Sequence, residues 1–466
     1  MQTEPHVVIV GGGFSGAAVA IHLLRLAPVG VRVTLLEPRE VPGTGVAYST
    51  PEASHRINVP ASRMQLAGEE DGTFDRWYRN QPAFVNDPQA LLADGTIYPQ
   101  RGQFGLYVAQ RFAEAARASA GRLTHLREQA LSFKDGEVIT DSGRRLPADL
   151  LVLAISHPPP SLPSLATPFA THPALIANPW RTGVLENIAP QASVAVMGTG
   201  LTMADTVATL WRLGHRGPIT AFSRHGLLSC SNLSGSSEPW PGEYSQGSLR
   251  QRLRQIRKDV DHAAAQGLPW QVVLDAVRNQ GQRIWQGLSV ADRQRFLRHL
   301  RSYWDVHRYR IAPQVAEVLA QRQSDGALRV QAARLTALEG DAQNLTLTLL
   351  PRNGETAQRV MVNHLIVTTG PAHGALIDSQ PLLRQLSQLG LIRADIFGLG
   401  LDVDKHSRAI GRKGQPTPDL LIAGPAARGH FGELMGLPQV ADHAAAVAAE
   451  ALSALGVKQS ARCPVF

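Results

Sequence analysis

Apolar residues gather in short runs without polar alternation, which is typical of strands buried on both faces of a parallel sheet. Residues 7–10 form the first such run and residues 31–36 the second. A glycine-rich turn at 11–16 and a helical pattern at 17–24 lie between them. This order predicts a strand–turn–helix–strand unit of a doubly wound α/β fold.

The glycines of this first turn have a spacing with a physical meaning. Gly11, Gly13 and Gly16 fit the pattern GxGxxG, and Glu37 ends the second strand. The first glycine permits a tight turn, the second lets a pyrophosphate approach the backbone, and the third allows close packing of helix on strand. Glu37 would accept hydrogen bonds from a ribose and repel a 2′-phosphate, so the unit predicts FAD or NAD rather than NADP. A glycine-rich turn with a structural glutamate is the alternative.

The same pattern returns in the middle of the chain. An apolar run at 193–197 leads to a second glycine turn that begins at Gly198. The next strand ends at Arg224, 26 residues further on, which is the spacing between the turn and the acid in the first unit. A guanidinium at this strand end suits the 2′-phosphate of NADPH. Met203 takes the place of the third glycine, so we expect the helix to lie slightly farther from the turn. A Rossmann-like unit that binds nothing is the alternative.

A longer layout is also repeated. Residues 123–155 and 328–370 each predict a small meander followed by an apolar strand that returns to its own sheet. An apolar strand at 419–424 and an alanine-rich helix from Pro438 to about Leu455 close the chain. We therefore predict an α/β protein of two Rossmann-like dinucleotide-binding domains, the FAD domain being split in sequence, with a helical insertion. The expected parts are the first part of the FAD-binding domain (1–158), an NADPH-type domain (159–370) with a basic helical insertion at about 231–322, and the second part of the FAD-binding domain (371–466).

Composition narrows the class of protein. The 466 residues are 44% hydrophobic and 18% charged, which fits a folded chain of two or three domains. The net charge is +8, and residues 250–310 alone carry twelve arginines and one lysine against five aspartates. This basic segment favours attraction of an anionic cofactor, substrate or redox partner over nucleic acid, which we consider unlikely. A solvated basic face is the alternative.

Several other classes lack support. Cys230 and Cys463 stand alone, so no disulfide framework, dithiol redox centre or metal site is predicted. Ser223, His225 and Asp205 could suggest a hydrolase triad, but the chain has no GxSxG elbow. The N-terminus lacks a basic leader pattern and no apolar run approaches the roughly 18 residues of a membrane span, so we expect a cytoplasmic protein without membrane contact.

On these motifs the sequence resembles the bacterial FAD/NAD(P)-binding oxidoreductases, a family of two-dinucleotide-binding-domain flavoproteins. It is distantly similar to N-hydroxylating and Baeyer–Villiger flavin monooxygenases. The resemblance covers most of the chain and rests on 11–16, 37–38, 43–49, 57–61 with Met64, Arg101 with 104–107, 198–205, 304–308, 424–425 and 428–429. One departure is residues 154–157, Ala-Ile-Ser-His, where such proteins often have Ala-Thr-Gly, so Ser156 is expected to alter the close approach at this crossing.

The resemblance also implies the binding residues. FAD would be held by Gly11, Gly13, Phe14, Ser15, Gly16, Glu37, Pro38, Arg39, Asn58, Met64, Arg101 and Gly424. NADPH would be held by Gly198, Gly200, Leu201, Thr202, Ser223, Arg224 and His225. Trp304, His307 and Arg308 could contact an anionic substrate or NADPH, and a pair on a helix surface is the alternative.

Three functions are compatible with these features. The first is an NADPH-dependent flavin monooxygenase that passes one oxygen atom of O₂, through a flavin–oxygen adduct, to a heteroatom such as an amine nitrogen of a small molecule. The flavin supplies the chemistry, so no catalytic amino-acid nucleophile is required. The second is a flavoprotein reductase that passes electrons to a carrier, a quinone or a partner protein. The third is a non-catalytic or RNA-binding flavoprotein. The sequence predicts no oligomeric state.

Overall fold

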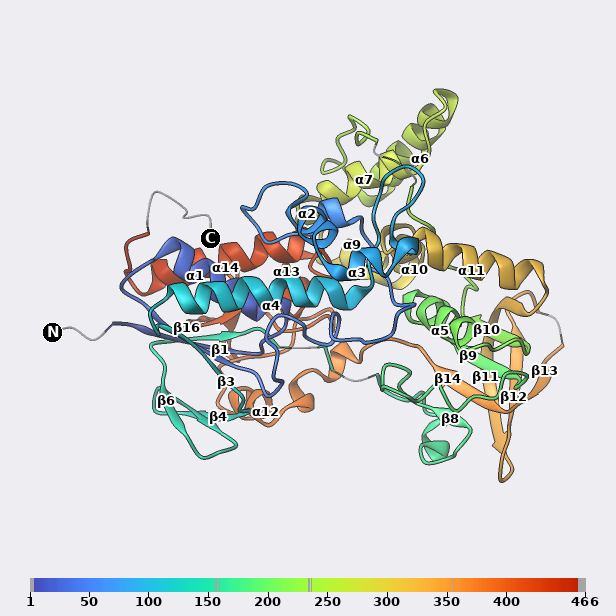
Figure 1. Ribbon diagram of the computed structural model, residues 1–466, viewed down its shortest axis with the longest axis horizontal. Coiled ribbons are helices and arrows are strands. Elements are labelled where there is room, and N and C mark those ends of the chain that lie inside the picture. The colour runs from blue at the N-terminus through green and yellow to red at the C-terminus, as the bar shows by residue number, and fades with distance from the viewer. Residues whose placement is uncertain are drawn as a thin grey trace.

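The computed structural model describes residues 4–155, 157–158, 160–233, 235, 237–354 and 356–459. These residues form two large sheets and one small one, and Figure 1 shows the two large sheets on opposite sides of the molecule. Each is built around parallel strands joined by helices, so the predicted α/β class with two Rossmann-like units is confirmed. The boundaries placed at 158/159 and 370/371 stay predictions.

The first sheet has the order β15-β16-β7-β1-β2-β3 and combines both ends of the chain. Its strands are β1 (His6–Val10), β2 (Arg32–Leu36), β3 (Leu123–Leu126), β7 (Leu150–Leu153), β15 (Arg408–Ile410) and β16 (Pro416–Ile422). All are parallel to their neighbours except β15, which lies antiparallel at the edge. Every residue of β1 is buried, as the unbroken apolar run predicts.

Three helices cover one face of this sheet (Figure 1). They are α1 (Phe14–Leu26), α4 (Arg101–Ala118) and α14 (Gln439–Ala454). Both α1 and α14 contain several buried alanines, and the two helices pack against each other. The other face carries α12 (Pro381–Gln388) and a separate meander of β4 (Ala130–Lys134), β5 (Glu137–Thr140) and β6 (Arg145–Pro147).

The second sheet has the order β13-β12-β11-β10-β9-β14-β8. Its strands are β8 (Leu175–Ile176), β9 (Val194–Met197), β10 (Ile219–Ser223), β11 (Leu328–Gly340), β12 (Leu345–Pro351), β13 (Gln358–Val362) and β14 (His364–Val367). The expected meander is present here too, but β11 pairs in parallel with β10, so the meander continues the sheet. Helices α5 (Leu201–Arg212) and α11 (Pro313–Ser324) pack on each other beside it.

A helical insertion interrupts the crossover from β10 to α11 and β11. Its elements are α6 (Leu249–Ala265), α7 (Gln271–Asn279), α8 (Gly281–Gln286), α9 (Val290–Arg295), the π-helical turn η4 (Phe296–Leu300) and α10 (Arg301–Arg308). It has a small apolar core of its own, and α6 and α7 project from the rest of the molecule in Figure 1.

Short elements complete the described chain. The helices are α2 (Thr73–Arg79), α3 (Pro82–Val85) and α13 (Arg428–Phe431), and the 3-10 turns are η1 (Ala61–Arg63), η2 (Pro88–Ala90), η3 (Thr167–Phe169), η5 (His373–Ala375), η6 (Ile377–Ser379) and η7 (Gly424–Ala427). No helix among the described residues is both long and apolar enough to cross a membrane.

Candidate functional site: two glycine turns and a cavity

The first glycine turn leaves no room for side chains at two of its positions. Gly11 has φ of +101°, and a Cβ there would lie 2.3 Å from the carbonyl oxygen of Ala154 on the neighbouring strand end. A Cβ on Gly16 would lie 1.9 Å from the carbonyl oxygen of Gly11. The turn therefore needs these glycines to fold helix α1 back onto β1, as the GxGxxG spacing predicts.

The remaining glycine of the motif serves another purpose. Gly13 is the N-cap of α1, with an extended backbone that any residue can adopt (φ −69°, ψ −169°). A Cβ there would make only an ordinary contact, 3.4 Å from the Cα of Gly45. The first turn of α1 holds no acidic side chain, and its N–H groups have no acceptor within the helix. Gly13 thus keeps open the approach to a helix end that favours anions.

A cavity of about 400 Å³ opens in front of this helix end. Its wall brings together seven of the twelve residues expected to hold FAD: Gly11, Gly13, Phe14, Ser15, Glu37, Pro38 and Arg39. The wall also contains residues outside that set of twelve: Thr44–Tyr48, Glu128–Ala130, Ile155, His157, Pro425, Met435–Leu437 and Val440. These residues come from segments far apart in the chain. Ser156 lies outside the described residues.

Glu37 is held in place by the backbone around it. Its carboxylate accepts hydrogen bonds from the N–H of Gly12 (2.8 Å) and the N–H of Arg39 (3.0 Å). The side chain is buried and faces the cavity. Each carboxylate oxygen has a second lone pair, so Glu37 can still accept from a hydroxyl group placed in the cavity.

The other five residues expected to bind FAD do not line this cavity. Gly16 and Gly424 lie behind it, and a Cβ on Gly424 would come 2.3 Å from the Oγ of Ser15. Met64 is 3% exposed in the core, and the carbonyl of Asn58 accepts a hydrogen bond from the Asn232 side chain (2.9 Å). Arg101 is the fifth.

Arg101 instead joins the two Rossmann-like units. Its guanidinium forms an ion pair with Asp205 of α5, with Nη1 and Oδ2 3.0 Å apart and both side chains buried. It also donates to the carbonyl of Arg56 through Nε and Nη2. Close by, the Thr209 hydroxyl bonds the ring of His55 across the same boundary (3.2 Å).

The second glycine turn repeats the geometry of the first. Gly198 has φ of +116°, and a Cβ there would lie 2.5 Å from Oγ1 and 2.7 Å from the carbonyl oxygen of Thr368 at the end of β14. Gly200 is the N-cap of α5, and a Cβ there would meet nothing within 4 Å. Leu201 and Thr202 begin the helix, and its first turn again carries no acidic side chain. Met203 is buried and 1% exposed.

The strand end of the second unit carries a group of cationic residues. Arg224 is exposed and His225 partly exposed at the end of β10. The Nδ1 of His225 lies 2.5 Å from the Nη1 of Arg352, which follows β12. Burial, then Arg352 and then Arg224 lower the pKa of His225 below its ordinary value. The hydroxyl group of Ser223 already has two hydrogen-bond partners nearby. Its Oγ bonds the Thr199 hydroxyl (2.8 Å) and accepts from the N–H of Gly226 (3.0 Å).

Sequence reasoning missed Arg352. It lies 128 residues after Arg224, and only the pairing of β10 with β11 and of β11 with β12 brings the two strand ends together. The N–H of Arg352 bonds the carbonyl of Ala332, the partner of Ser223 in the sheet. The repeated meander is the sequence signal that could have led to Arg352, because its hairpin pairs with β10 through β11 and ends beside Ser223.

Comparison with known proteins agrees with this arrangement. Residues 8–158 match the model of a family described as FAD-NAD(P)-binding, and no curated protein sequence matches the chain. Among solved structures, reduced ornithine hydroxylase from Pseudomonas aeruginosa is 15% identical with a TM-score of 0.61, covering 97% of this chain and 100% of that chain. L-lysine 6-monooxygenase from Pseudomonas syringae is 18% identical with a TM-score of 0.59, covering 97% and 98%.

A third structure, the FAD-bound cadaverine monooxygenase of desferrioxamine biosynthesis from Erwinia amylovora, is 14% identical with a TM-score of 0.60, covering 100% of this chain and 98% of that chain. The chain has the two-dinucleotide-binding-domain flavoprotein fold. The expected similarity to N-hydroxylating monooxygenases is thus confirmed at the level of the fold. In dinucleotide-binding folds in general, phosphates lie where a glycine turn meets a helix N-terminus.

The structure also shows the contacts of Trp304, His307 and Arg308, the three residues considered for substrate binding. Trp304 and Arg308 both bond Glu433, through Nε1 to Oε1 (3.0 Å) and Nε to Oε2 (2.9 Å). These bonds fasten the helical insertion to the segment between α13 and α14. His307 donates a hydrogen bond from Nδ1 to the carbonyl of Tyr303 (2.7 Å) and packs against Trp270. Trp304 and His307 line a second cavity, which lies within the insertion.

Proposed function

We propose that the protein is an FAD-dependent oxidoreductase that uses NADPH and oxygenates the amine nitrogen of a small molecule. The observation that carries the proposal is the contrast between the two strand ends. A buried carboxylate faces the first glycine turn, whereas two arginines and a histidine, without an acidic residue, lie at the strand ends beside the second. One site suits a free ribose and the other suits a phosphorylated one.

The residues of the first cavity fit FAD. The open helix end of α1 would hold the pyrophosphate, and Glu37 would accept from the adenosine ribose. Phe14, Tyr48 and Phe104 pack together beside the loop at 44–48 and exclude water from this side. Burial raises the pKa of Tyr48 to about 12, so its hydroxyl keeps its proton at neutral pH. Bound FAD would accept hydride from NADPH and react with O₂.

The start of α14 supports the same placement. Met435, Gly436, Leu437 and Val440 line the cavity, so the N-terminal end of this helix borders it. A helix N-terminus stabilises negative charge on a neighbouring group. Such charge develops on the ring of a reduced flavin, and the helix would stabilise it there.

The second unit fits NADPH. The helix end of α5 would hold its pyrophosphate, and Arg224, His225 and Arg352 would surround its 2′-phosphate. Arginine matches phosphate oxygens with two parallel donors, and the two arginines come from different strands. The side chain of Ser223 orients the turn through Thr199 and Gly226.

Oxygenation is favoured over electron transfer to a dithiol. Cys230 and Cys463 are the chain's two cysteines and are far apart in sequence, so no CxxC pair can relay electrons. The solved structures reported above are named as amine hydroxylases and monooxygenases, and an ornithine N-hydroxylase from Kutzneria sp. 744, also of this fold, was solved with reduced FAD, NADP⁺ and L-ornithine. An amine is therefore the first substrate class to test.

The test is product formation coupled to NADPH use. FAD-loaded protein is incubated in air with NADPH and a panel of primary diamines, amino acids and aliphatic amines, and hydroxylamines are measured by mass spectrometry. The proposal expects one amine to give about one oxygenated product per NADPH consumed. Steady NADPH consumption without oxygenated product, together with rapid reduction of a quinone or a one-electron acceptor, would identify a reductase instead.

A further inference from the structure

The second cavity lies inside the helical insertion and is separate from the cavity assigned to FAD. Its volume is also about 400 Å³, within the range of small-molecule sites. It is lined by residues of α6, α7, α8, η4 and α10 of the insertion and of α13 in the first domain. The segment 428–437 separates the two cavities, since Gly432 and Glu433 line this one and Met435 to Leu437 line the other.

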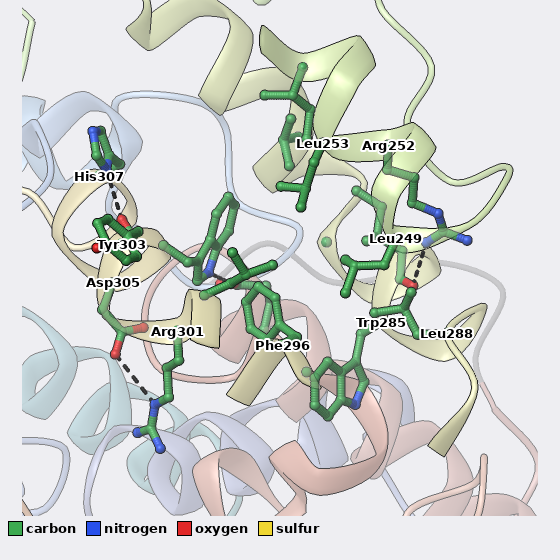
Figure 2. A pocket seen from close by; sticks show the side chains of 18 of the residues that line it. Leu249, Arg252, Leu253, Trp285, Leu288, Phe296, Arg301, Tyr303, Asp305 and His307 are labelled. Atoms are coloured by element: carbon green, nitrogen blue, oxygen red, sulfur yellow. Dashed lines mark hydrogen bonds and ion pairs between the residues drawn. The ribbon is translucent and has the colours of Figure 1, made fainter. Parts of the chain in front are cut away.

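Most of the wall is apolar. Figure 2 shows Leu249 and Leu253 of α6 facing Phe296 across the cavity, with Trp285 below them. Leu249, Leu253 and Phe296 are only half-buried, because their free faces border the cavity rather than other side chains. Large apolar side chains left open to a concave space indicate a site for an apolar group.

Charged side chains lie at one end of the cavity, and the carboxylates among them have hydrogen-bond or ion-pair partners. Figure 2 shows Arg301 and Asp305 joined at this end, with Nε and Oδ2 3.4 Å apart. Glu433 accepts from Trp304 and Arg308. Both carboxylates of the wall therefore already have cationic or N–H partners.

Arg428 is the remaining charge at this end. Its side chain is 7% exposed and lines the cavity, and its Nε is buried without a hydrogen-bond partner among the described residues. Burial lowers the pKa of Arg428, which is the expected result when a guanidinium loses water without gaining a full counter-charge. Tyr309 lines the same cavity, and burial raises its pKa, so its hydroxyl remains a donor.

A π-helical turn contributes to the same wall. Residues Phe296–Leu300 form this turn, and Phe296, Leu297 and Leu300 border the cavity. Such turns are rare, cost backbone regularity and occur often at functional sites. Here the turn points an extra apolar surface into the cavity.

We infer that this cavity binds an amphipathic carboxylic acid, with its carboxylate on the Arg428 guanidinium and the Tyr309 hydroxyl and its apolar body between α6 and the π-helical turn. A carboxylate would complete the hydrogen bonding of Arg428 and balance its charge. A cation would meet an unpaired guanidinium, and a neutral alcohol would leave it unpaired. The inference does not rest on the proposed function, because it concerns binding alone.

The test compares three ligands with the same chain and different head groups. Octanoate, 1-octanol and octylamine are titrated below their aggregation limits into the full-length FAD-loaded protein by calorimetry, with intrinsic tryptophan fluorescence, to which Trp285 and Trp304 of the cavity wall contribute, as a second readout. Octanoate should bind at least ten-fold more tightly than octylamine and more tightly than 1-octanol. Octanoate binding that is undetectable at millimolar concentration, or no tighter than octylamine binding, would overturn the inference.

Two variants locate the site. Arg428→Met should weaken octanoate binding about ten-fold or more and leave 1-octanol binding within two-fold, while Arg298→Met, which removes an exposed arginine of the same π-helical turn, should change neither. Leu253→Trp should fill the apolar end and weaken decanoate more than hexanoate. Thermal unfolding checks that each variant is folded. Unchanged octanoate affinity in folded Arg428→Met, or equal losses in Arg298→Met, would contradict the assignment, and the Leu253→Trp series decides the case if Arg428→Met does not fold.

Discussion

The two strand–turn–helix–strand units of this protein share one backbone plan. In each, a glycine with positive φ presses against the end of a neighbouring strand, at Ala154 in the first unit and Thr368 in the second. In each, an extended glycine caps the following helix and leaves its N-terminus open. The units therefore offer the same kind of phosphate site, and this shared part follows from the chain's need to turn sharply from strand to helix.

The units differ at the end of the second strand. Glu37 is buried and fixed by two backbone N–H groups, whereas Arg224 and Arg352 are exposed. A buried carboxylate can recognise hydroxyl groups without water competing for it. Exposed arginines can receive a doubly charged phosphate and still be solvated when it is absent. We therefore expect one scaffold to bind two nucleotides of different charge, according to the residues at its strand ends.

The largest expected effect comes from breaking the link between the units. Arg101→Met leaves Asp205 buried without its cation, and we expect a loss of about 3–5 kcal/mol in the free energy of unfolding, measured by urea denaturation. The double variant Arg101→Met with Asp205→Leu should recover most of this loss, because an apolar pair can replace a buried ion pair. A loss below about 1 kcal/mol in the single variant would show that the link contributes little.

The next prediction distinguishes the N-terminus of α1 from the N-terminus of α5. Gly13→Ala should weaken FAD binding about a hundred-fold, or ~2.7 kcal/mol, because its methyl group would occupy the approach to the pyrophosphate. Gly200→Ala is the matched variant and should raise the KM for NADPH while leaving the FAD content unchanged. Both glycines have backbone angles open to alanine, so both variants should fold. An equal loss of FAD in both would argue against separate sites.

A smaller effect tests the cationic strand end. Arg224→Ala and Arg352→Ala should each lower the ratio of kcat/KM for NADPH over NADH about ten-fold, since a hydrogen bond to a charged group contributes ~1.5–3 kcal/mol. The kinetics of both cofactors are measured by flavin reduction. Arg216→Ala, at an arginine stacked on Trp211 elsewhere in this domain, serves as the control. An unchanged ratio in the Arg224 and Arg352 variants would remove the assignment of this end to the 2′-phosphate.

The smallest effect concerns pH. The pKa of free His225 is lowered, and a bound phosphate would raise it, so NADPH binding should take up a proton. Affinity for NADPH relative to NADH should therefore increase a few-fold as the pH falls through the range below 6.5, beyond the change due to the phosphate itself. His225→Asn should lose this additional increase. The comparison is made by titrating both proteins with both cofactors at several pH values.

Much of the fold was predictable because its signals are local. The runs at 7–10 and 193–197 lie in β1 and β9, and the glycine turns lie between strand and helix as expected. The residues of the first cavity near Gly11 and Glu37 were found for the same reason, since a motif of contiguous residues fixes their positions. A helical insertion was also predicted, and its helices α6 to α10 lie within the expected range of about 231–322.

The remaining site residues depend on contacts between distant segments. Arg352 contacts His225 because the strands that precede these residues lie in one sheet. Arg101 contacts Asp205 because the two Rossmann-like units pack against each other. The basic segment gives a similar lesson. Arg278 bonds the carbonyl of Leu437, Arg308 bonds Glu433 and Arg310 pairs with Asp275, so part of the charge that suggested attraction of anions holds the insertion in place. Sequence composition counts such residues without showing their partners.

The most direct test of the central claim is anaerobic reduction of the FAD-loaded protein in a stopped-flow instrument. NADPH and NADH are mixed with the natural protein and with the Arg224→Ala, Arg352→Ala double variant, and the loss of flavin absorbance is followed. The account predicts rapid reduction by NADPH, reduction by NADH at least ten-fold slower at subsaturating concentration, and little preference in the double variant. Failure of the natural protein to bind FAD, or equal rates with NADPH and NADH, would contradict it.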